Sequence, residues 1–114
     1  MNTRKFSNVQ EKVVAKKLGG KKNSNSGATP FIKGDVQLEN FLIECKTTTQ
    51  KKTSISIKEE WLIKLKQEAF AMNKPYRMLA FNFGPGEKNF YIVDENLIKY
   101  VIELINKEEN KDGN

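Results

Sequence analysis

The chain lacks the residues on which several common kinds of site depend. It contains no histidine and only one cysteine. An internal disulfide is therefore impossible, a zinc finger is excluded, and acid–base chemistry has to use carboxylates, lysine, serine or tyrosine. No apolar run approaches the length of a membrane span, and the polar N-terminus does not resemble a signal peptide. We therefore expect a cytoplasmic protein in a reducing environment, with no membrane partner.

The length of the chain limits the number of domains, and its net charge indicates which partners it favours. Its 114 residues suffice for a single domain with one modest core. The 20 basic and 14 acidic residues give a net charge of +6. Such an excess favours nucleic acid or an anionic membrane surface, although a lysine-rich soluble surface would give the same count. We expect one domain over residues 1–106 and a polar C-terminal tail over residues 107–114.

The hydrophobic periodicity predicts an α/β fold. Apolar residues recur at helical spacing over residues 4–18 and 58–73, and again after Asp94, which can cap a last helix reaching about residue 105. Alternating or continuous apolar runs predict strands over residues 34–38, 40–48, 53–57, 76–83 and 89–93. The expected order is α-β-β-β-α-β-β-α, with a mixed central sheet flanked by helices.

Two carboxylates and a lysine stand out in the predicted hairpin over residues 34–48. Glu44 and Lys46 are two residues apart on one strand, so their side chains share a face, while Cys45 points to the other. Asp35 lies nine residues before Glu44 across a turn, which lets the two lie side by side. With the backbone carbonyl of Cys45, these carboxylates suit a hard cation such as Mg²⁺. A lysine beside that cation stabilises charge on phosphorus, so the group predicts phosphodiester hydrolysis.

A Glu-x-Lys tripeptide alone carries little information. The chain contains a second one, Glu109-Asn110-Lys111, within the predicted tail. The first is distinguished by the apolar strand around it and by Asp35 on the preceding strand, because charged residues on such a strand need partners or a cleft. The competing interpretation is a structural Glu–Lys cross-strand pair on a half-exposed sheet.

Residues on either side of the hairpin could support the same chemistry. Glu11 lies at the margin of the apolar stripe of the first helix, where it either faces the edge of a cleft or is a solvated helix charge. Residues 21–30 form a polar segment rich in donors for phosphate, which could equally be an ordinary linker. The candidate phosphate contacts in this segment and after the hairpin are Lys21, Lys22, Ser24, Ser26, Thr47, Lys51 and Lys52.

The segments Gly34-Asp35 and Glu44-Cys45-Lys46-Thr47-Thr48 resemble the core motif of the PD-(D/E)-x-K nuclease superfamily. The order of elements up to about residue 105 is most similar to the archaeal-type Holliday junction resolvases and their phage relatives. The resemblance implies a restriction-endonuclease-like core in which Asp35 and Glu44 bind the metal and Lys46 is the catalytic lysine. It also implies that Glu11 completes the metal site and that Ser26 is the loop serine brought towards the junction.

The resemblance further implies a reaction and an assembly. Members of this family are homodimers that make paired nicks in four-way DNA junctions with Mg²⁺ or Mn²⁺, during DNA recombination and repair. The same core also serves restriction enzymes and repair nucleases, so a general or restriction-like nuclease acting on duplex DNA is a second hypothesis. A third is a non-catalytic DNA-binding module on this scaffold, which would bind DNA in a salt-sensitive way without cleaving it.

Overall fold

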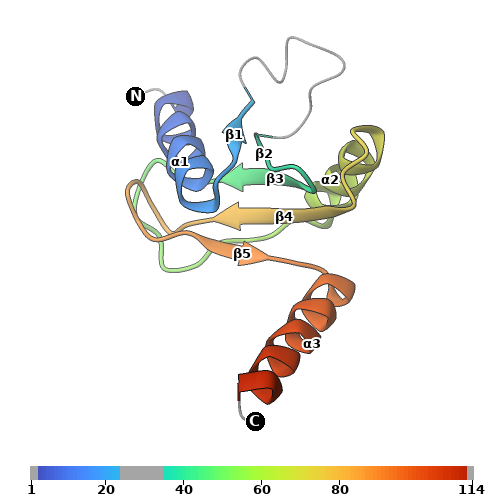
Figure 1. The fold of residues 1–114 in the computed structure, drawn as a ribbon. Coiled ribbons are helices and arrows are strands. Elements are labelled where there is room, and N and C mark those ends of the chain that lie inside the picture. Colours follow the sequence, from blue (N-terminus) through green and yellow to red (C-terminus); the bar gives the residue numbers. More distant parts are fainter. Residues whose placement is uncertain (1–2, 24–34, 113–114) are drawn as a thin grey trace.

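The structure is a computed structural model that describes residues 3–23 and 35–112 (Figure 1). In this part of the chain the helices are α1 (Thr3–Leu18), α2 (Glu59–Ala71) and α3 (Glu95–Asp112). The strands are β1 (Lys21–Lys22), β2 (Val36–Gln37), β3 (Phe41–Lys46), β4 (Tyr76–Phe81) and β5 (Phe90–Ile92). The predicted loop residues 24–30 and the predicted strand residue Gly34 lie outside the described residues.

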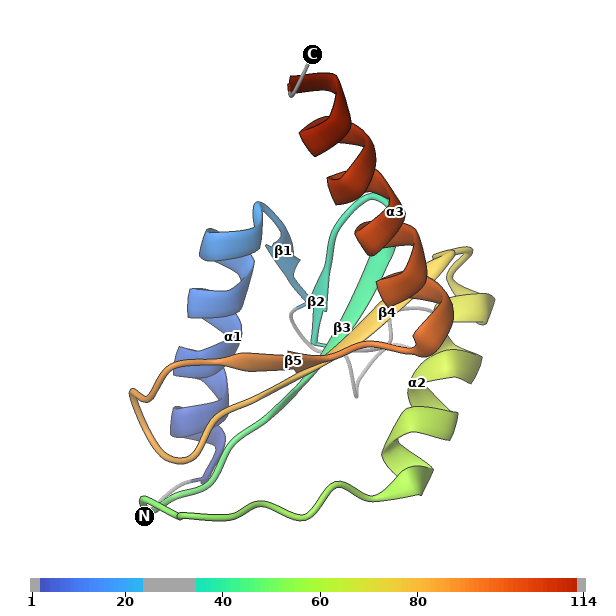
Figure 2. The same ribbon diagram turned by 90° about the horizontal axis from the view of Figure 1, so that it is seen from below.

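The strands form one mixed sheet in the order β1-β2-β3-β4-β5. Strands β3 and β4 run parallel, whereas the other neighbouring pairs are antiparallel. A parallel pair requires a crossover connection, which α2 provides between β3 and β4. Helix α1 packs on one face of the sheet and α2 on the opposite face (Figure 2). The predicted α/β fold with a mixed central sheet and flanking helices is therefore confirmed.

Strand β3 supplies side chains to both cores by simple alternation. Leu42 is fully buried with Leu65 on the side of α2. Ile43 and Cys45 are buried on the other side, against Val14 of α1. Each fully buried leucine or isoleucine stabilises the fold by roughly 1.5–3 kcal/mol. The prediction that Cys45 is a core residue facing away from its two charged neighbours is confirmed.

Two glycines place the short strand β1 beside β2. Gly19 ends α1 in the left-handed region with φ 72°, and the Gly20 N–H donates to the Ala15 carbonyl at 2.8 Å. A Cβ atom on Gly20 would lie 2.7 Å from Leu38 Cδ1 and 2.9 Å from the carbonyl oxygen of Gln37. Only glycine fits this approach, so these residues fix the path of the chain from α1 to the sheet.

Asn73 and Asp94 cap the end of α2 and the start of α3. Asn73 has φ 57°, and its N–H donates to the Phe70 carbonyl at 3.1 Å. The next amide donates to the Ala69 carbonyl at 2.8 Å, which completes a Schellman motif at the end of α2. Asp94 Oδ1 accepts the Leu97 N–H at 2.9 Å, so the predicted cap of α3 is confirmed.

Three predicted features of the fold are wrong. Residues 53–57 form no strand within the described sheet, although Ile55 and Ile57 are less exposed than their neighbours, as the alternation indicated. Residues 21–22, assigned to a loop, form β1. Helix α3 continues to Asp112, so residues 107–112 are helical rather than a tail. Lysine and glutamate dominate this extension and are good helix formers, which explains the difference.

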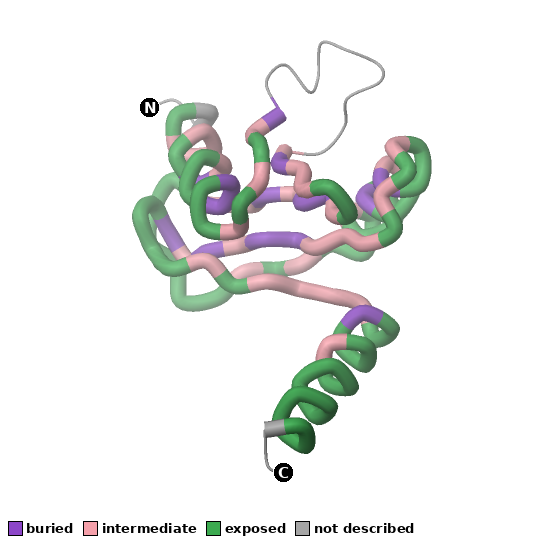
Figure 3. The backbone as a smooth tube through the Cα atoms, viewed as in Figure 1, coloured by how far each residue is buried: buried purple, intermediate pink, exposed green. Residues whose placement is uncertain are grey.

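Helix α3 leaves the sheet after β5 and projects away from the other elements (Figure 1). Leu97 in its first turn is buried, whereas residues 102–111 are all exposed (Figure 3). Within the described residues, no helix combines the length and the apolar character needed to cross a membrane.

Candidate active site

The hairpin of β2 and β3 brings Asp35 and Glu44 together. Val36 pairs with Ile43 in the antiparallel register, which places Asp35 opposite Glu44 at the end of the ladder. The Asp35 N–H donates to the Ile43 carbonyl at 3.0 Å, and Asp35 Oδ2 accepts the Cys45 N–H at 2.7 Å. A side-chain hydrogen bond also joins the Asp35 and Glu44 carboxyl groups. The structure thus confirms that the turn places these two carboxyl groups in contact.

The contact makes Glu44 a strongly perturbed acid. Burial raises the pKa of its carboxyl from 4.5 to about 9, and the hydrogen bond and the negative charge of Asp35 act in the same direction. Lys46 opposes this rise, whereas Glu68 of α2 adds to it. Two carboxyl groups in hydrogen-bond contact cannot both ionise without a compensating cation, so at neutral pH this pair retains a proton. A hard divalent cation is the natural replacement for that proton.

Glu11 approaches the pair from α1. Its side chain is only 12% exposed, and its Oε1 lies 3.8 Å from Lys22 Nζ on β1. It is therefore turned towards the sheet rather than solvated. Burial raises the pKa of the Cys45 thiol, and the negative charges of Asp35, Glu11 and Glu44 raise it further. Glu11, Asp35 and Glu44, from three different segments of the chain, therefore all act electrostatically on this residue.

These carboxylates do not form a ready-made metal cage. Among residues 3–23 and 35–112, no group of three or more histidine, cysteine, aspartate or glutamate side chains is close enough together to hold a metal ion. Asp35 and Glu44 share a hydrogen bond, whereas Glu11 is paired with Lys22. The carboxyl oxygens of Asp35 and Glu44 are of the kind that Mg²⁺ prefers as ligands. Glu11 as a third ligand stays a prediction, because it has to leave Lys22.

Lys46 emerges on the same face as Glu44, under helix α2. Its ammonium lies 4.3 Å from the centre of the Trp61 ring, within the range of a cation–π contact. Lys58 approaches the same ring at 5.9 Å. In the described part of the chain, none of the ion pairs joins Glu44 to Lys46. The alternative of a structural Glu–Lys pair stays open, because the charge of Lys46 lowers the Glu44 pKa, while the cation–π contact places the ammonium over Trp61.

A buried amide network fixes the end of β3, and the sequence analysis did not identify it. Gln10 is 3% exposed, and its Nε2 donates to the Lys46 carbonyl at 2.9 Å and to Asn89 Oδ1 at 3.0 Å. Thr47 Oγ1 donates to Asn82 Oδ1 at 2.6 Å, and Asn82 Nδ2 donates to Asn89 Oδ1 at 3.3 Å. Thr47, predicted as a phosphate contact, thus holds the strand end. A signal existed, since Gln10 interrupts the apolar stripe of α1.

The remaining predicted phosphate contacts are scattered around the site. Lys22 faces Glu11, whereas Lys21 and Lys52 are exposed. Lys51 forms an ion pair with Glu87 of the hairpin between β4 and β5. Ser24 and Ser26 lie outside the described residues, so their predicted roles are not placed by the structure.

Comparisons of the chain with models of protein families, with curated proteins and with solved structures found no match. The resemblance of the hairpin motif to the PD-(D/E)-x-K nucleases therefore stays a prediction. The geometry of Asp35, Glu44 and Lys46 is what supports a function.

Proposed function

We propose that this protein is a divalent-metal-dependent DNA endonuclease with a restriction-endonuclease-like core. The observation that carries the proposal is the buried contact between Asp35 and Glu44, with the ammonium of Lys46 on the same face. A structural role alone does not explain a carboxyl pair that destabilises its own ionised form. Such perturbed acids are typical of functional sites, where a bound cation relieves the repulsion.

Each residue of the site would have a distinct role in phosphodiester hydrolysis. The Cys45 N–H orients Asp35, and the carboxyl groups of Asp35 and Glu44, which now share a hydrogen bond, would bind Mg²⁺ or Mn²⁺ in place of their proton. The Cys45 carbonyl and Glu11 are further candidate ligands. The bound cation supplies Lewis acidity, which polarises a phosphodiester and lowers the pKa of a water. Lys46, held over Trp61, stabilises negative charge on the phosphate, and the Gln10 contact to its carbonyl fixes the strand that presents it.

We further propose that the substrate is a four-way DNA junction and that a homodimer presents two such sites. Two copies related by twofold symmetry match the symmetry of a junction that is nicked in two opposed strands. The net charge of +6 suits a polyanionic substrate. Lys21 and Lys22 lie on β1, which pairs with β2, and Lys52 lies on the segment that follows β3.

The decisive experiment compares Asp35→Asn with the wild type on a synthetic four-way junction and on a duplex of the same sequence, with Mg²⁺. Asparagine can still accept the Cys45 N–H but cannot supply a charge, so we expect cleavage to fall by about 100-fold or more. Junction binding should persist, because the lysines are intact. Glu39→Gln is the matched control, since Glu39 is exposed at the turn of the same hairpin and should leave the rate unchanged.

Each other result has a definite meaning. Full activity of Asp35→Asn would refute the assigned site. Equal wild-type rates on the junction and on the duplex would reject junction selectivity while keeping the nuclease. Salt-sensitive DNA binding without cleavage in either Mg²⁺ or Mn²⁺ would replace the nuclease by a DNA-binding module.

A further inference from the structure

A cavity of about 230 Å³ lies between α1 and the hairpin that joins β4 to β5. Phe6 and Val9 of α1 and Pro85 of the hairpin give it apolar walls. Val9 and Pro85 are exposed, so the cavity is open to solvent. At roughly 30 Å³ for each water in the liquid, its volume equals that of about eight water molecules. The cavity therefore suits a single small ring system rather than a larger ligand.

Hydrogen bonds fix which way the buried amides at this cavity point. The Gly84 N–H donates to Asn82 Oδ1, so Asn82 Nδ2 faces Asn89 and donates to its Oδ1. Gln10 Nε2 donates to the same Asn89 oxygen and to the Lys46 carbonyl. Backbone groups at both ends of this chain of bonds therefore determine the orientation of all three amides.

This orientation leaves one acceptor and one donor unused. Gln10 is 3% exposed, and its Oε1 has no hydrogen-bond partner among the described residues. In the same part of the chain Asn89 bonds through its Oδ1 only, so its Nδ2 donates to nothing. A buried acceptor without a partner costs about 1–3 kcal/mol. Both residues line the cavity, so the unused acceptor and donor come from two amides in direct contact beside it.

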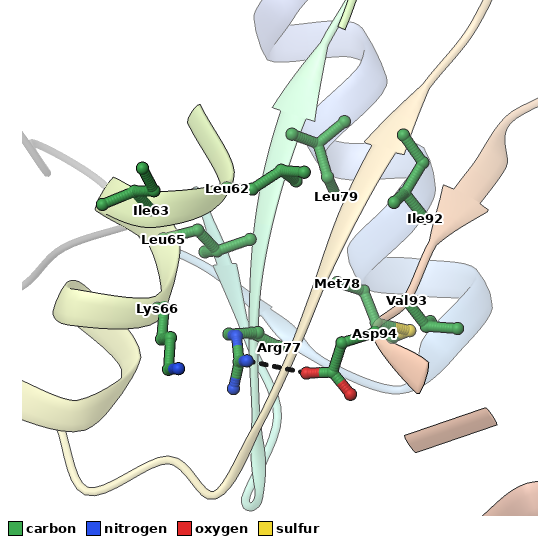
Figure 4. A pocket seen from close by; sticks show the side chains of 10 residues that line it. All are labelled: Leu62, Ile63, Leu65, Lys66, Arg77, Met78, Leu79, Ile92, Val93 and Asp94. Atoms are coloured by element: carbon green, nitrogen blue, oxygen red, sulfur yellow. Dashed lines mark ion pairs between the residues drawn. The ribbon is translucent and has the colours of Figure 1, made fainter. Parts of the chain in front are cut away.

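A groove of the same volume, about 230 Å³, lies between α2 and strands β4 and β5 (Figure 4). Apolar side chains such as Leu62 and Ile63 line most of it. Figure 4 shows Arg77 directed at Asp94, and their ion pair measures 2.7 Å, so the charge of the arginine is already neutralised. The described residues of this groove include no buried polar side chain that lacks a partner. The cavity beside α1 is thus the one whose polar groups indicate a ligand.

The unused groups match the Watson–Crick edge of a nucleobase. Each base presents an N–H donor next to an acceptor on this edge, and proteins read an unpaired base by hydrogen bonds to the edge and by stacking on aromatic or apolar side chains. The Gln10 acceptor and the Asn89 donor complement such an edge, and the Phe6 ring can stack on the base. In duplex DNA the partner strand occupies the same edge. The cavity therefore favours an unpaired base over a paired one.

The charge around the cavity selects an anionic ligand. Helix α1 carries five basic residues and one acidic residue, a net charge of +4. Lys5 is exposed and lines the cavity, and the described residues that line it include no acid. Lys5 precedes Gln10 by five residues, a rise of about 7.5 Å along the helix, which suits the separation of the base edge and the phosphate in one nucleotide. A neutral amide would leave Lys5 unused, so a nucleotide fits better than a peptide.

We infer that this cavity binds one unpaired nucleobase with its phosphate on Lys5. The ligand is either a nucleotide in a single-stranded segment of DNA or a free nucleoside monophosphate. Gln10 Oε1 accepts an N–H of the base, and Asn89 Nδ2 donates to the neighbouring acceptor. The inference goes beyond the proposed nuclease and does not rest on it, since no carboxyl group takes part. The two sites still meet at Lys46, whose carbonyl accepts the Gln10 N–H.

The test is a titration of the ¹⁵N-labelled full chain with dAMP, dCMP, dGMP or dTMP in EDTA, followed by the NMR signals of the Gln10 and Asn89 side-chain amides. We expect these signals to shift and to saturate with a Kd of about 1 mM or lower for at least one nucleotide. Deoxyribose 5-phosphate should bind at least about 10-fold more weakly, because it lacks the stacking and the hydrogen bonds of the base.

Three variants make the test specific. Asn89→Asp keeps the oxygen that accepts from Gln10 but removes the free donor, so it should weaken the tightest-binding nucleotide at least about 10-fold. Lys5→Gln should weaken that nucleotide about 3- to 10-fold and leave its nucleoside unaffected, because the nucleoside has no phosphate. Lys16→Gln is the matched control, since Lys16 is exposed on the same helix but does not line the cavity. Circular dichroism checks that each variant is folded, and Lys5→Gln carries the test if Asn89→Asp is not.

A pentanucleotide whose only base is at its centre distinguishes the two sources of the ligand. Binding at least about 10-fold tighter than that of the free nucleotide identifies a DNA strand, and equal binding identifies the free nucleotide. The absence of saturable shifts with all four nucleotides at about 10 mM would overturn the inference. So would equal binding of deoxyribose 5-phosphate, or a Kd that neither Asn89→Asp nor Lys5→Gln changes. A chain that binds nucleotides in this way but never cleaves DNA would refute the nuclease and leave the cavity standing.

Discussion

Replacing Glu44 by glutamine should make the metal-free protein more stable at alkaline pH. The pKa of this carboxyl is raised from 4.5 to about 9 by burial and by Asp35. Between these two values the folded protein holds a proton that the unfolded chain has released. The free energy of unfolding of the wild type should therefore fall as the pH rises, by up to about 1.4 kcal/mol per pH unit. Glutamine resembles the protonated acid and removes this dependence.

The size of the effect follows from the pH interval. Between pH 5.5 and pH 8 the wild type should lose about 3 kcal/mol relative to Glu44→Gln, a large fraction of the stability of a small domain. This difference corresponds to a Tm shift of roughly 10 °C for a chain of this length. Urea unfolding followed by circular dichroism, with a chelator present, measures it at each pH. Glu39→Gln, an exposed change in the same hairpin, should follow the wild type.

Mg²⁺ should cancel most of the stability difference between the two proteins at pH 8. A cation bound at Asp35 and Glu44 replaces the retained proton, so it should stabilise the wild type at pH 8 by about 2.7 kcal/mol at a hundredfold excess over its Kd. Glu44→Gln should not respond. A wild-type stability that is flat or rising between pH 5.5 and pH 8, or a parallel curve for the variant, would refute the buried acid pair.

Two further predictions concern residues that the structure places next to the site and at the end of α2. Trp61→Ala should slow Mg²⁺-dependent cleavage by roughly 5–30-fold, because it removes a cation–π contact of about 1–2 kcal/mol from Lys46. The loss should appear in kcat. Trp61→Phe should recover most of the rate, and Lys58→Gln should have little effect on it. An unchanged kcat in Trp61→Ala would show that the ring only fills the core. Asn73→Ala should lower the free energy of unfolding by about 1 kcal/mol. Asn73 has φ 57°, and alanine is less stable than asparagine in this left-handed conformation. Asn73→Gly should be at least as stable as the wild type by urea unfolding, and an equal loss in both variants would contradict this explanation.

The pairing of Asp35 with Glu44 was predictable because it depends on local rules. Alternation along a strand places Glu44 and Lys46 on one face, and a short turn returns the chain beside them. The cap at Asp94 is also local, because it needs only the geometry of one helix end. These features were predicted correctly because they do not depend on residues that are distant in the sequence.

The missed features depend on such partners. Residues 53–57 alternate as a strand does, yet a strand exists only where a neighbour supplies hydrogen bonds, and the described sheet has its neighbours elsewhere. The buried position of Gln10 depends on Asn89, which lies 79 residues away. The position of Lys46 over Trp61 likewise depends on how α2 returns across the sheet. The interruption of the α1 stripe at Gln10 could have indicated a buried polar residue, but the sequence does not show which distant residues Gln10 and Lys46 contact.

The parallel pairing of β3 with β4 separates two events in the folding of the site. The β2–β3 hairpin closes through a turn over residues 38–40, and before α2 packs on the sheet the Glu44 carboxyl should still be in water. Strand β4 can join only after residues 47–75, which include α2, have formed the crossover. Docking of that crossover should bury Glu44, and the Glu44 carboxyl should then take up the proton that it holds in the folded protein. The rate of proton uptake, followed with an indicator dye in weak buffer, should therefore report when the crossover docks, independently of when the hairpin forms.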